Sequence, residues 1–393
     1  MKILFIHNRY QLHGGEDIAV EKELQLLNQH HEVEILYFQN QLGWRGVVQF
    51  VVSIWNINAA KKVSKKIIEF KPDVVHIHNW HFACGPLVFR TIHTFKIPTV
   101  HTIHNYRLLC PSGTLLNKGK LFKGSLKQSF PWASVKNKVY RSSYILTFWL
   151  AFVVWFHKKI NTWKMIDCYV CLTSSAVTLF QESNFGICEK RFVVKPNFTS
   201  FPVIKESSKS GEHFLFIGRL SEEKGIATLL KAFQDLPYDI RIAGEGPMKK
   251  QVVNASRQSE NIFYLGNLTR YELESELQKT QALIFPSIWH EPFGLVNIEA
   301  FASSTPVLAS NIGAPTSLII EGYNGFLFEP GNETALKETI IKFDNLSKLD
   351  KDQIGKNAFE QYKSKYSPDL QLDYLNSIYN SAIKNRVHLA VNI

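Results

Sequence analysis

Short apolar segments alternate with longer amphipathic segments along most of this chain. The apolar segments are rich in Val, Ile and Phe, and most of them end at a Gly, Pro or Ser turn. This alternation is typical of strand–helix units, which build parallel sheets covered by helices. In the first half the expected strands are 2–7, 32–38, 73–78, 98–103, 167–172 and 191–194.

The second half repeats the same rhythm. Its expected strands are 213–218, 239–243, 261–265, 281–286, 306–310 and 325–328. Thr269 and Glu272 have the spacing of a capping box, which predicts that a helix begins between two of these strands. The tail over 369–385 has a helical pattern and is expected to pack on one of the two halves.

The length of 393 residues exceeds what one hydrophobic core usually supports, so we expect two domains. A polar stretch over 205–212 without apolar periodicity marks the linker. We therefore predict an α/β protein with Rossmann-like domains over 1–196 and 197–366 and a helical tail over 367–393. The tail packs across either domain, and a return to the first domain is one of these two arrangements. Two such domains joined by a linker are expected to face each other across a cleft. Ligands are expected in this cleft, at the carboxyl ends of the strands of each sheet.

Charge narrows the range of partners. The chain has 45 Lys and Arg against 34 Asp and Glu, a formal net charge of +11, which favours nucleotides, phospholipid surfaces or nucleic acid. No recognised nucleic-acid-binding module is found, so nucleic acid is not an expected partner.

The first apolar run is too short for a signal peptide, which predicts a cytoplasmic location. The odd number of cysteines argues against a disulfide framework, and Cys168 and Cys171 are expected in a buried strand without redox or zinc chemistry.

One segment breaks the pattern. Residues 144–156 are almost entirely apolar and aromatic, with Arg141, Lys158, Lys159 and Lys164 beside them. Because a membrane span needs about 20 apolar residues, this run is too short to cross a bilayer. Residues 141–164 are therefore expected to make a peripheral contact with anionic lipid on the inner face of the membrane. A buried core helix with a solvated basic flank is the alternative.

The most informative stretch is Phe285-Pro-Ser-Ile-Trp-His-Glu-Pro-Phe-Gly-Leu-Val-Asn-Ile-Glu-Ala. It predicts a strand end, a loop carrying Glu291, and a helix that begins near Gly294 and carries Glu299. The start of such a helix offers free N–H groups and a positive dipole to an anion, and the two carboxylates can accept hydrogen bonds from hydroxyl groups. Spacing alone also fits two solvated acids, but the Pro-Phe-Gly elbow favours a binding site.

A second candidate stretch is Phe216-Ile-Gly-Arg-Leu-Ser-Glu-Glu-Lys-Gly, a strand followed by a Gly-bounded turn. Arg219 and Lys224 in this turn can neutralise a diphosphate, although ordinary solvated turn residues fit the pattern as well. After the next strand, Gly244 and Gly246 permit the close approach of a base or ribose, or form a plain tight turn.

In the first half, Gly14 and Gly15 follow the first strand and begin a helix, so that backbone N–H groups can contact a phosphate or an acceptor.

Histidines gather at two strand ends, in 76–81 and 101–104. His76 and His78 share a strand face, but no carboxylate lies in either cluster, so a metal site is not expected. His104 is better suited to contact a substrate, or to pack. Asp350-Lys-Asp352 lies in a helix-like surface region, which gives no sign of a metal–diphosphate clamp.

Taken together, these motifs resemble the family 4 retaining glycosyltransferases of the GT-B fold. The resemblance covers nearly the whole chain and is most specific in the second half. Its motifs are Gly218-Arg-Leu-Ser-Glu-Glu-Lys-Gly225, Gly244-Glu-Gly-Pro247, Pro286-Ser-Ile-Trp-His-Glu-Pro-Phe-Gly294 with Glu291 and Glu299 as an E-x7-E pair, Asn324-Gly-Phe-Leu, and His104-Asn-Tyr-Arg-Leu-Leu-Cys-Pro111.

The resemblance implies a hexosyltransferase that moves a sugar from a nucleotide-sugar donor to a glycan or lipid-linked glycan in cell-surface polysaccharide biosynthesis, without a cofactor or metal. The first domain would bind the acceptor and the second the donor. Arg219 and Lys224 would hold the diphosphate, Glu299 the ribose, Glu291 the donor sugar, and His104 would lie near the reacting sugar. The implied donor-binding set is Gly14, Gly15, Gly218, Arg219, Lys224, Gly244, Glu245, Glu291, Phe293, Gly294, Leu295 and Glu299, and the catalytic set is His104, Arg219, Lys224 and Glu291.

Two positions depart from that family's pattern. Asn105 stands where a subset of the family has Asp, which bears on the acceptor side, and Thr316 stands where many members have Glu, in a loop near the donor. Two other functions stay open: a catalytically inactive membrane-associated scaffold, and a nucleotide-sugar epimerase. The intact set of two cations and two acids argues against the scaffold, and the epimerase would need further acid–base residues.

Overall fold

The structure is a computed structural model that describes residues 1–9, 14–200, 211 and 213–391. It has two compact units. The first contains Met1–Leu115, Phe122–Asn197 and the C-terminal helix, and the second contains Leu116–Leu121 and Phe198–Ser367. The predicted linker over 205–212 lies almost entirely outside the described residues.

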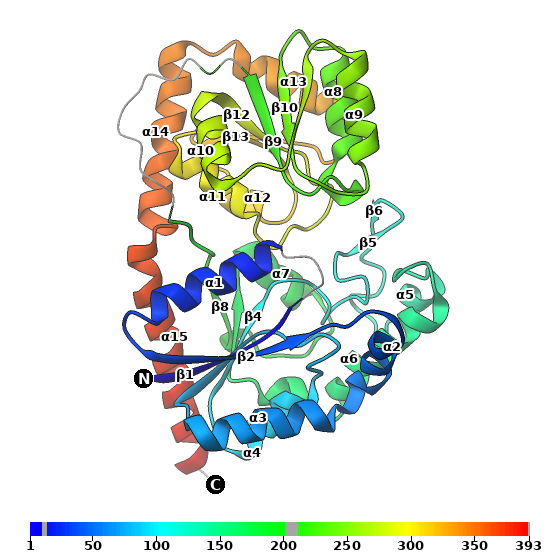
Figure 1. Cartoon of the computed structure of the whole chain (residues 1–393), viewed down its shortest axis with the longest axis vertical. Helices are drawn as coiled ribbons and strands as arrows, with labels where there is room; N and C mark the ends of the chain where they lie inside the picture. Colours follow the sequence, from blue (N-terminus) through cyan, green and yellow to red (C-terminus); the bar gives the residue numbers. More distant parts are fainter. Residues whose placement is uncertain (10–13, 201–210, 212, 392–393) are drawn as a thin grey trace. The chain divides into compact units, whose positions relative to one another are not determined.

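The first unit is built on a parallel sheet in the order β2-β1-β3-β4-β7-β8 (Figure 1). Successive side chains of a strand point to opposite faces, so both faces of this sheet are apolar and need helices to cover them. The strands are β1 (Lys2–Arg9), β2 (Glu32–Gln39), β3 (Val74–Asn79), β4 (Thr99–Ile103), β7 (Cys168–Cys171) and β8 (Phe192–Val194).

Separate cores fill the two faces. Leu4 and Ile6 of β1 pack in the core on the side of α3 and α4, whereas Ile3 and Phe5 pack on the side of α1 and α15. The C-terminal helix is therefore an integral layer of this unit. The helices are α1 (Gly15–Leu27), α2 (Gly43–Val52), α3 (Ile57–Phe70), α4 (Leu87–Thr94), α5 (Trp132–Lys136), α6 (Tyr144–Lys159), α7 (Ser174–Glu182) and α15 (Pro368–Val391).

The second unit repeats the architecture with the parallel order β11-β10-β9-β12-β13-β14. Its strands are β9 (His213–Ile217), β10 (Ile240–Ala243), β11 (Ile262–Gly266), β12 (Thr280–Phe285), β13 (Val307–Ser310) and β14 (Gly325–Phe328). Its helices are α8 (Ile226–Gln234), α9 (Lys249–Gln258), α10 (Arg270–Lys279), α11 (Leu295–Ala302), α12 (Pro315–Leu318), α13 (Glu333–Asp344) and α14 (Lys348–Lys365). A short antiparallel hairpin of β5 (Leu116–Asn117) and β6 (Lys120–Leu121) clusters with this unit.

The predicted α/β architecture with two Rossmann-like sheets is confirmed, and the strand ends differ from the predicted ones by at most two residues. The capping box is present, since Thr269 accepts from the backbone of Glu272 and the Glu272 side chain accepts from the backbone of Thr269. Cys168 and Cys171 are buried in β7, and burial raises the pKa of the Cys168 thiol to about 12. Such a thiol is inert at neutral pH.

Candidate functional site

The loop after β9 carries two of the predicted cations. Arg219 is exposed, and Lys224 ends a short 3-10 turn over Glu222–Lys224. Gly225 follows with φ +72, a conformation that favours glycine, and a Cβ there would lie only 1.9 Å from the carbonyl oxygen of Pro286. The sequence therefore needs glycine here so that this loop can approach the end of β12.

That approach brings Lys224 to Glu291. Nζ of Lys224 donates to Oε2 of Glu291 at 2.5 Å, and Nε1 of Trp289 donates to the same oxygen at 2.9 Å. The ammonium also lies 5.6 Å from the ring centroid of Phe285 and 5.7 Å from that of Trp289, within the range of cation–π attraction. The side chains of Lys224 and Glu291 are both largely buried, and their ion pair fixes the orientation of each.

Helix α11 begins directly after this loop. Gly294 caps it with φ +82, and the first N–H groups of a helix have no partner within the helix. Phe293 is buried and its ring packs near that of Tyr366, so only its backbone is available to a ligand. Glu299 lies on the buried side of α11, with Oε1 3.6 Å from the Arg270 guanidinium. The predicted helix start near Gly294 is thus confirmed.

Asn297 on α11 is a candidate that sequence reasoning missed. It is fully buried, and neither polar atom of its side chain has a hydrogen-bond partner among the described residues. A buried amide without partners is costly, so such a group is a candidate ligand contact. The available signal was an amide residue between the apolar residues Val296 and Ile298, three residues after the Gly294 cap.

The glycines after β10 have a structural role. A Cβ on Gly244 would lie 1.9 Å from the carbonyl oxygen of Gly218, and one on Gly246 would lie 2.3 Å from that of Leu220. They let the β10 loop pack directly on the loop that carries Arg219. Glu245 between them is exposed and is held by Lys249 at 2.8 Å, whose hydrogen bond lowers the pKa of this carboxyl. This packing explains the glycines without a ligand.

In the first unit, Gly14 caps helix α1 and Gly15 begins it. The backbone N–H of Gly14 donates to Oδ2 of Asp17 at 2.9 Å, and Oδ1 of Asp17 lies 2.9 Å from Nε2 of His7. The buried Asp17 therefore fixes the glycine turn to β1. Sequence reasoning missed this residue, although its place three residues after the cap was the signal for it.

Glu16 is a second acid near the same turn. Burial raises its pKa to about 8, despite the Arg107 guanidinium and hydrogen bonds with Asn79 and Asn105, which lower it. The backbone N–H of Arg107 donates to Oδ1 of Asn105 at 3.2 Å, which leaves the Asn105 amide N–H groups to donate to Glu16. Asp17 is already a neighbouring acid that raises this pKa, and Asn105 avoids the further carboxylate that an Asp would place beside Glu16.

The histidine clusters meet inside the first unit. His76, on β3, hydrogen-bonds Tyr379 at 2.9 Å and Thr102 at 2.7 Å, and Nδ1 of His78 lies 3.0 Å from Nε2 of His104. His78, His104 and Asn105 line one pocket with residues that follow β3 and β4. Burial and neighbouring cations hold the pKa values of His76, His78 and His104 well below the usual range, so these rings are neutral near pH 7.

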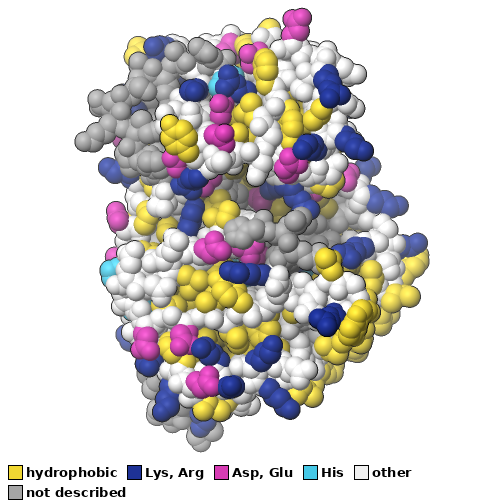
Figure 2. Space-filling view, viewed as in Figure 1, with side chains coloured by type: hydrophobic (Ala, Val, Ile, Leu, Met, Phe, Trp, Pro, Cys, Tyr) yellow, Lys and Arg dark blue, Asp and Glu magenta, His cyan; other side chains and the backbone are white. Residues whose placement is uncertain are grey.

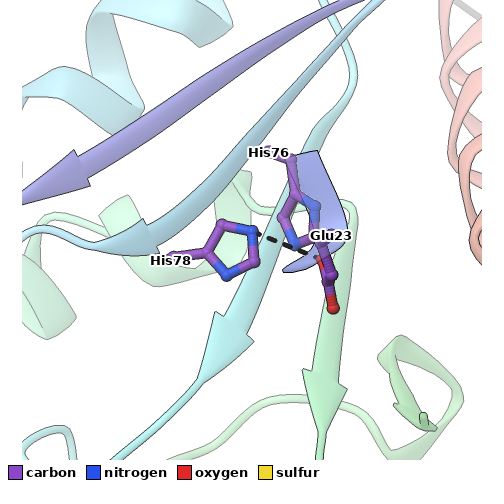
Figure 3. Close-up of side chains that lie close together, drawn as sticks. All are labelled: Glu23, His76 and His78. Atoms are coloured by element: carbon purple, nitrogen blue, oxygen red, sulfur yellow. Dashed lines mark ion pairs between the residues drawn. The ribbon is translucent and has the colours of Figure 1, made fainter. Parts of the chain in front are cut away.

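Glu23 completes a cluster that the sequence pattern did not reveal. Its carboxylate, His76 and His78 each offer a ligand atom within 4.8 Å of the others, which corrects the expectation that no carboxylate joins these histidines (Figure 3). Lys195, however, already donates to Glu23, and both nitrogens of His76 have hydrogen-bond partners. A metal would have to displace the buried ammonium, so we do not assign these residues as metal ligands. The signal for Glu23 was its place on the buried stripe of α1, between Val20 and Leu27.

Two family models match consecutive parts of the chain. The model described as Glycosyltransferase Family 4 matches residues 24–200, and the one described as Glycosyl transferases group 1 matches residues 198–361. The first match falls on the unit that carries His104, and the second on the unit that carries Lys224 and Glu291. Both agree with the resemblance inferred from the motifs.

Individual proteins also match this chain, over different shares of its length. An uncharacterized glycosyltransferase of Methanocaldococcus jannaschii is 33% identical over 155 residues, which are 39% of this chain and 43% of that protein. The capsular polysaccharide biosynthesis glycosyltransferase CapM of Staphylococcus aureus is 28% identical over 178 residues, 43% of this chain and 46% of CapM. The crystal structure of Anabaena HepE in complex with UDP and glucose superposes with a TM-score of 0.66 at 18% identity, covering 97% of this chain and 100% of that one. At that identity the superposition shows a shared fold.

Proposed function

Because the chain belongs to the family 4 glycosyltransferases of the GT-B fold, we propose that it transfers a sugar from a nucleotide-sugar donor to a glycan or lipid-linked glycan, with retention of anomeric configuration. The likeness to CapM supports a place in cell-surface polysaccharide biosynthesis. The likeness to a structure that contains UDP and glucose makes UDP-sugars the first donors to test.

The Lys224–Glu291 pair beside the start of α11 is the observation that carries this proposal. An ammonium has three N–H donors, and Glu291 occupies one of them, so two are left for a diphosphate. The positive end of the helix dipole favours the same anion. The Glu291 carboxylate can accept hydrogen bonds from sugar hydroxyls without strongly repelling the diphosphate, because Lys224 neutralises the charge of this carboxylate.

The remaining proposed roles follow the resemblance to the family. Arg219 and Lys224 stabilise the negative charge that develops on the leaving diphosphate. Such electrostatic stabilisation is usually the largest single contribution to an enzyme's rate enhancement. Glu299 accepts from the ribose hydroxyls, and the backbone of Phe293 to Leu295 contacts the sugar or a phosphate. His104 contacts a hydroxyl of the reacting sugar. No metal is required, since protein cations supply the positive charge.

A thermal-shift panel with UDP, GDP, ADP and CMP and their sugars tests the donor site, since a ligand that binds the native state raises its apparent stability. We expect one nucleotide series to stabilise the wild type, and Lys224→Met to abolish the shift. Lys231→Met is the matched control: this lysine of α8 is mostly exposed, lies outside the proposed site and pairs with Glu333. Equal shifts in the two variants, or no shift with any nucleotide, would contradict the proposal.

Two alternatives make different predictions. A catalytically inactive scaffold would neither release nucleotide from a sugar donor nor be stabilised by it. A nucleotide-sugar epimerase would change the donor's configuration without needing an acceptor. Incubation of the stabilising donor with lipid-linked glycan, followed by mass spectrometry of donor and acceptor, separates the three. Transfer of a hexose mass to the acceptor is the outcome we expect.

A peripheral membrane contact also forms part of the proposal, and charge segregation supports it. Residues 35–68 and 74–166 contain Lys and Arg but no Asp or Glu. All of these residues except 116–121 belong to the first unit. Anionic lipids attract basic residues by about 1 kcal/mol each near the surface. Within the described helices, none is long and apolar enough to cross a bilayer, so the proposed contact is one of surface binding.

The exposed apolar residues of this unit gather on α2. Trp44, Val47, Val48 and Val51 have the i, i+3, i+4, i+7 spacing of one helix face, yet all are exposed and the helix has no buried residue. Figure 2 shows hydrophobic side chains massed over this region with Lys and Arg beside them. An exposed apolar stripe without a covering element marks an interaction surface.

Helix α6 contributes less to this surface than the sequence predicted. Its Leu150, Ala151 and Val153 are buried, which is the core-helix alternative, and its exposed large apolar residues, Tyr144, Ile145 and Phe148, all lie in the first turns. Lys158 donates to the backbone oxygen of Asn184 and is partly withdrawn from water. We therefore propose that α2 and the start of α6 form the lipid-binding surface, with exposed cations such as Arg45, Lys138 and Arg141 at its edge.

A further inference from the structure

A chain of polar side chains leads from the interior of the first unit to His104. Lys195 and Glu23 are both almost fully buried, and the Lys195 ammonium donates to Oε1 of Glu23. The other carboxylate oxygen lies 3.6 Å from Nε2 of His78, the contact drawn as a dashed line in Figure 3. Nδ1 of His78 in turn lies 3.0 Å from Nε2 of His104. These residues come from α1, β3 and the segments after β4 and β8.

The proton positions along this chain follow from the chemistry of its members. A carboxylate held by an ammonium is ionised and only accepts hydrogen bonds. Oε2 of Glu23 and Nε2 of His78 are both buried, and neither has another hydrogen-bond partner among the described residues. An unprotonated Nε2 would set its lone pair against the carboxylate, and 3.6 Å leaves no room for a bridging water. His78 therefore carries its proton on Nε2.

A neutral imidazole has one N–H and one lone pair, so a proton on Nε2 makes Nδ1 of His78 an acceptor. Nε2 of His104 must then be the donor across 3.0 Å. This leaves the lone pair of His104 on Nδ1. That atom has no hydrogen-bond partner among the described residues, and His104 is partly exposed where it lines the pocket with Asn105.

We propose that Glu23 and His78 act as positioning residues that hold His104 in the tautomer with its proton on Nε2, so that Nδ1 accepts a hydrogen bond from a hydroxyl of the sugar substrate. This inference rests on the proposed function for the identity of the ligand, but the tautomer itself is a property of the free protein. His104 acts here as an acceptor for a hydroxyl, not as a cation for the phosphates.

Nitrogen-15 NMR of histidine-labelled full-length protein reads the tautomer directly, because the protonated and unprotonated ring nitrogens have different shifts and couplings to the ring protons. His78→Gln and His104→Gln variants assign the signals. We expect both rings in the Nε2–H form. A wild-type His104 with its proton on Nδ1 would overturn the proposal.

Glu23→Gln tests the cause. With Lys195 still donating to the side-chain oxygen, the Gln amide presents N–H to Nε2 of His78, which inverts the relay and moves the His104 proton to Nδ1. Glu23→Gln combined with Lys195→Met is the second variant, since the single change strands a buried ammonium. His101→Gln is the control: it is buried and lines the same pocket, but it hydrogen-bonds the backbone oxygen of Ile77. An unchanged His104 tautomer in both Glu23 variants would contradict the proposal.

Kinetics provide the functional readout. Inverting the relay turns an acceptor into a donor at one sugar hydroxyl, so we expect transfer to fall about tenfold, the effect of one hydrogen bond, with nucleotide affinity unchanged. Loss of nucleotide affinity in the Glu23 variants would mean a general structural defect instead. If the wild type transfers no sugar, the proposed function fails while the NMR result still decides the relay.

Discussion

Nζ of Lys224 lies 2.5 Å from Oε2 of Glu291, although 67 positions separate the two residues in the sequence. They belong to the loops that follow β9 and β12, which are neighbours in the second sheet. The carboxyl ends of adjacent parallel strands meet at one edge, so topology rather than sequence distance joins this pair. The pair is therefore assembled before any ligand binds.

A double-mutant cycle on this pair tests whether its members act together at the donor site. We expect Lys224→Met to lower the transfer rate about 100-fold or more, as the loss of a group that stabilises transition-state charge does. Glu291→Gln should also lower it, because it removes the carboxylate that orients Lys224 and is proposed to accept from the sugar hydroxyls. The double variant should lose much less than the sum, with a coupling of about 1–3 kcal/mol. The measurement is kcat/KM for sugar transfer in all four proteins. Additive effects would show that the two residues act independently.

Vesicle flotation tests the α2 surface. Replacing Trp44, Val47 and Val51 by Glu should weaken binding to anionic vesicles about tenfold or more, because it removes apolar contacts and adds repulsion. The matched control replaces Tyr271 and Leu349 by Glu; both are apolar and even more exposed, but they lie in the second unit. We expect the control to bind as the wild type does. Lys136, Lys138 and Arg141 replaced by Glu should also release the protein, and high salt should have the same effect.

The Glu16 carboxyl predicts a pH dependence of stability. Its pKa is about 8 in the folded protein and near 4.5 when unfolded, so the folded state binds the extra proton between those values. The free energy of unfolding should therefore fall as pH rises from 4.5 to 8 through this group. Glu16→Gln removes this contribution, and its urea midpoint should exceed that of the wild type increasingly from pH 5 to pH 9. Parallel curves for the two proteins would refute the shifted pKa.

Asn105→Asp gives the converse test at the same place. The change introduces the residue that a subset of the family has, but here it puts a further carboxyl beside Glu16, in addition to Asp17. Two close carboxyls disfavour each other's ionisation, so this variant should lose more stability with rising pH than the wild type. A melting series from pH 5 to pH 9 measures the difference.

Gly225→Ala should loosen the loop that carries Lys224. The Cβ of an alanine there would lie 1.9 Å from the carbonyl oxygen of Pro286, and the alanine would also have to adopt a φ of +72. Gly266→Ala is the control for backbone strain alone, because it has φ +76 and no atom within 4 Å. We expect the control to lose about 1 kcal/mol and Gly225→Ala at least 2 kcal/mol more. Chemical denaturation measures both, and equal losses would show that the contact with Pro286 is unimportant.

Chelation tests the absence of a metal requirement. Prolonged dialysis against EDTA should leave transfer unchanged, and elemental analysis of the purified protein should find no stoichiometric metal. If a metal did occupy Glu23, His76 and His78, dialysis would lower stability and Lys195→Ala would raise metal affinity by removing the competing ammonium.

The architecture and the polar motifs of the second unit could be predicted from local sequence patterns. Alternating apolar runs define strands whatever the surroundings, and a Gly-bounded turn or a capping box is a local property of a few residues. The expected helix start at Gly294 and the box at Thr269 therefore agree with the structure. Local patterns also placed Arg219 and Lys224 at a strand end, where the fold needs glycine at 225 to form the turn.

Local patterns could not predict which distant groups are in contact or which surfaces are left uncovered, because both depend on how the elements pack. In the sequence, Glu23 is one of several charged residues of a helix. In the folded protein, the packing of α1 on the sheet places it beside His78 and Lys195. Helix α2 has an amphipathic pattern typical of a core helix, yet no element covers its apolar face among the described residues. Sequence periodicity gives the direction of a side chain along its own element. Its partner depends on strand order and helix docking, which arise from the packing of the whole unit.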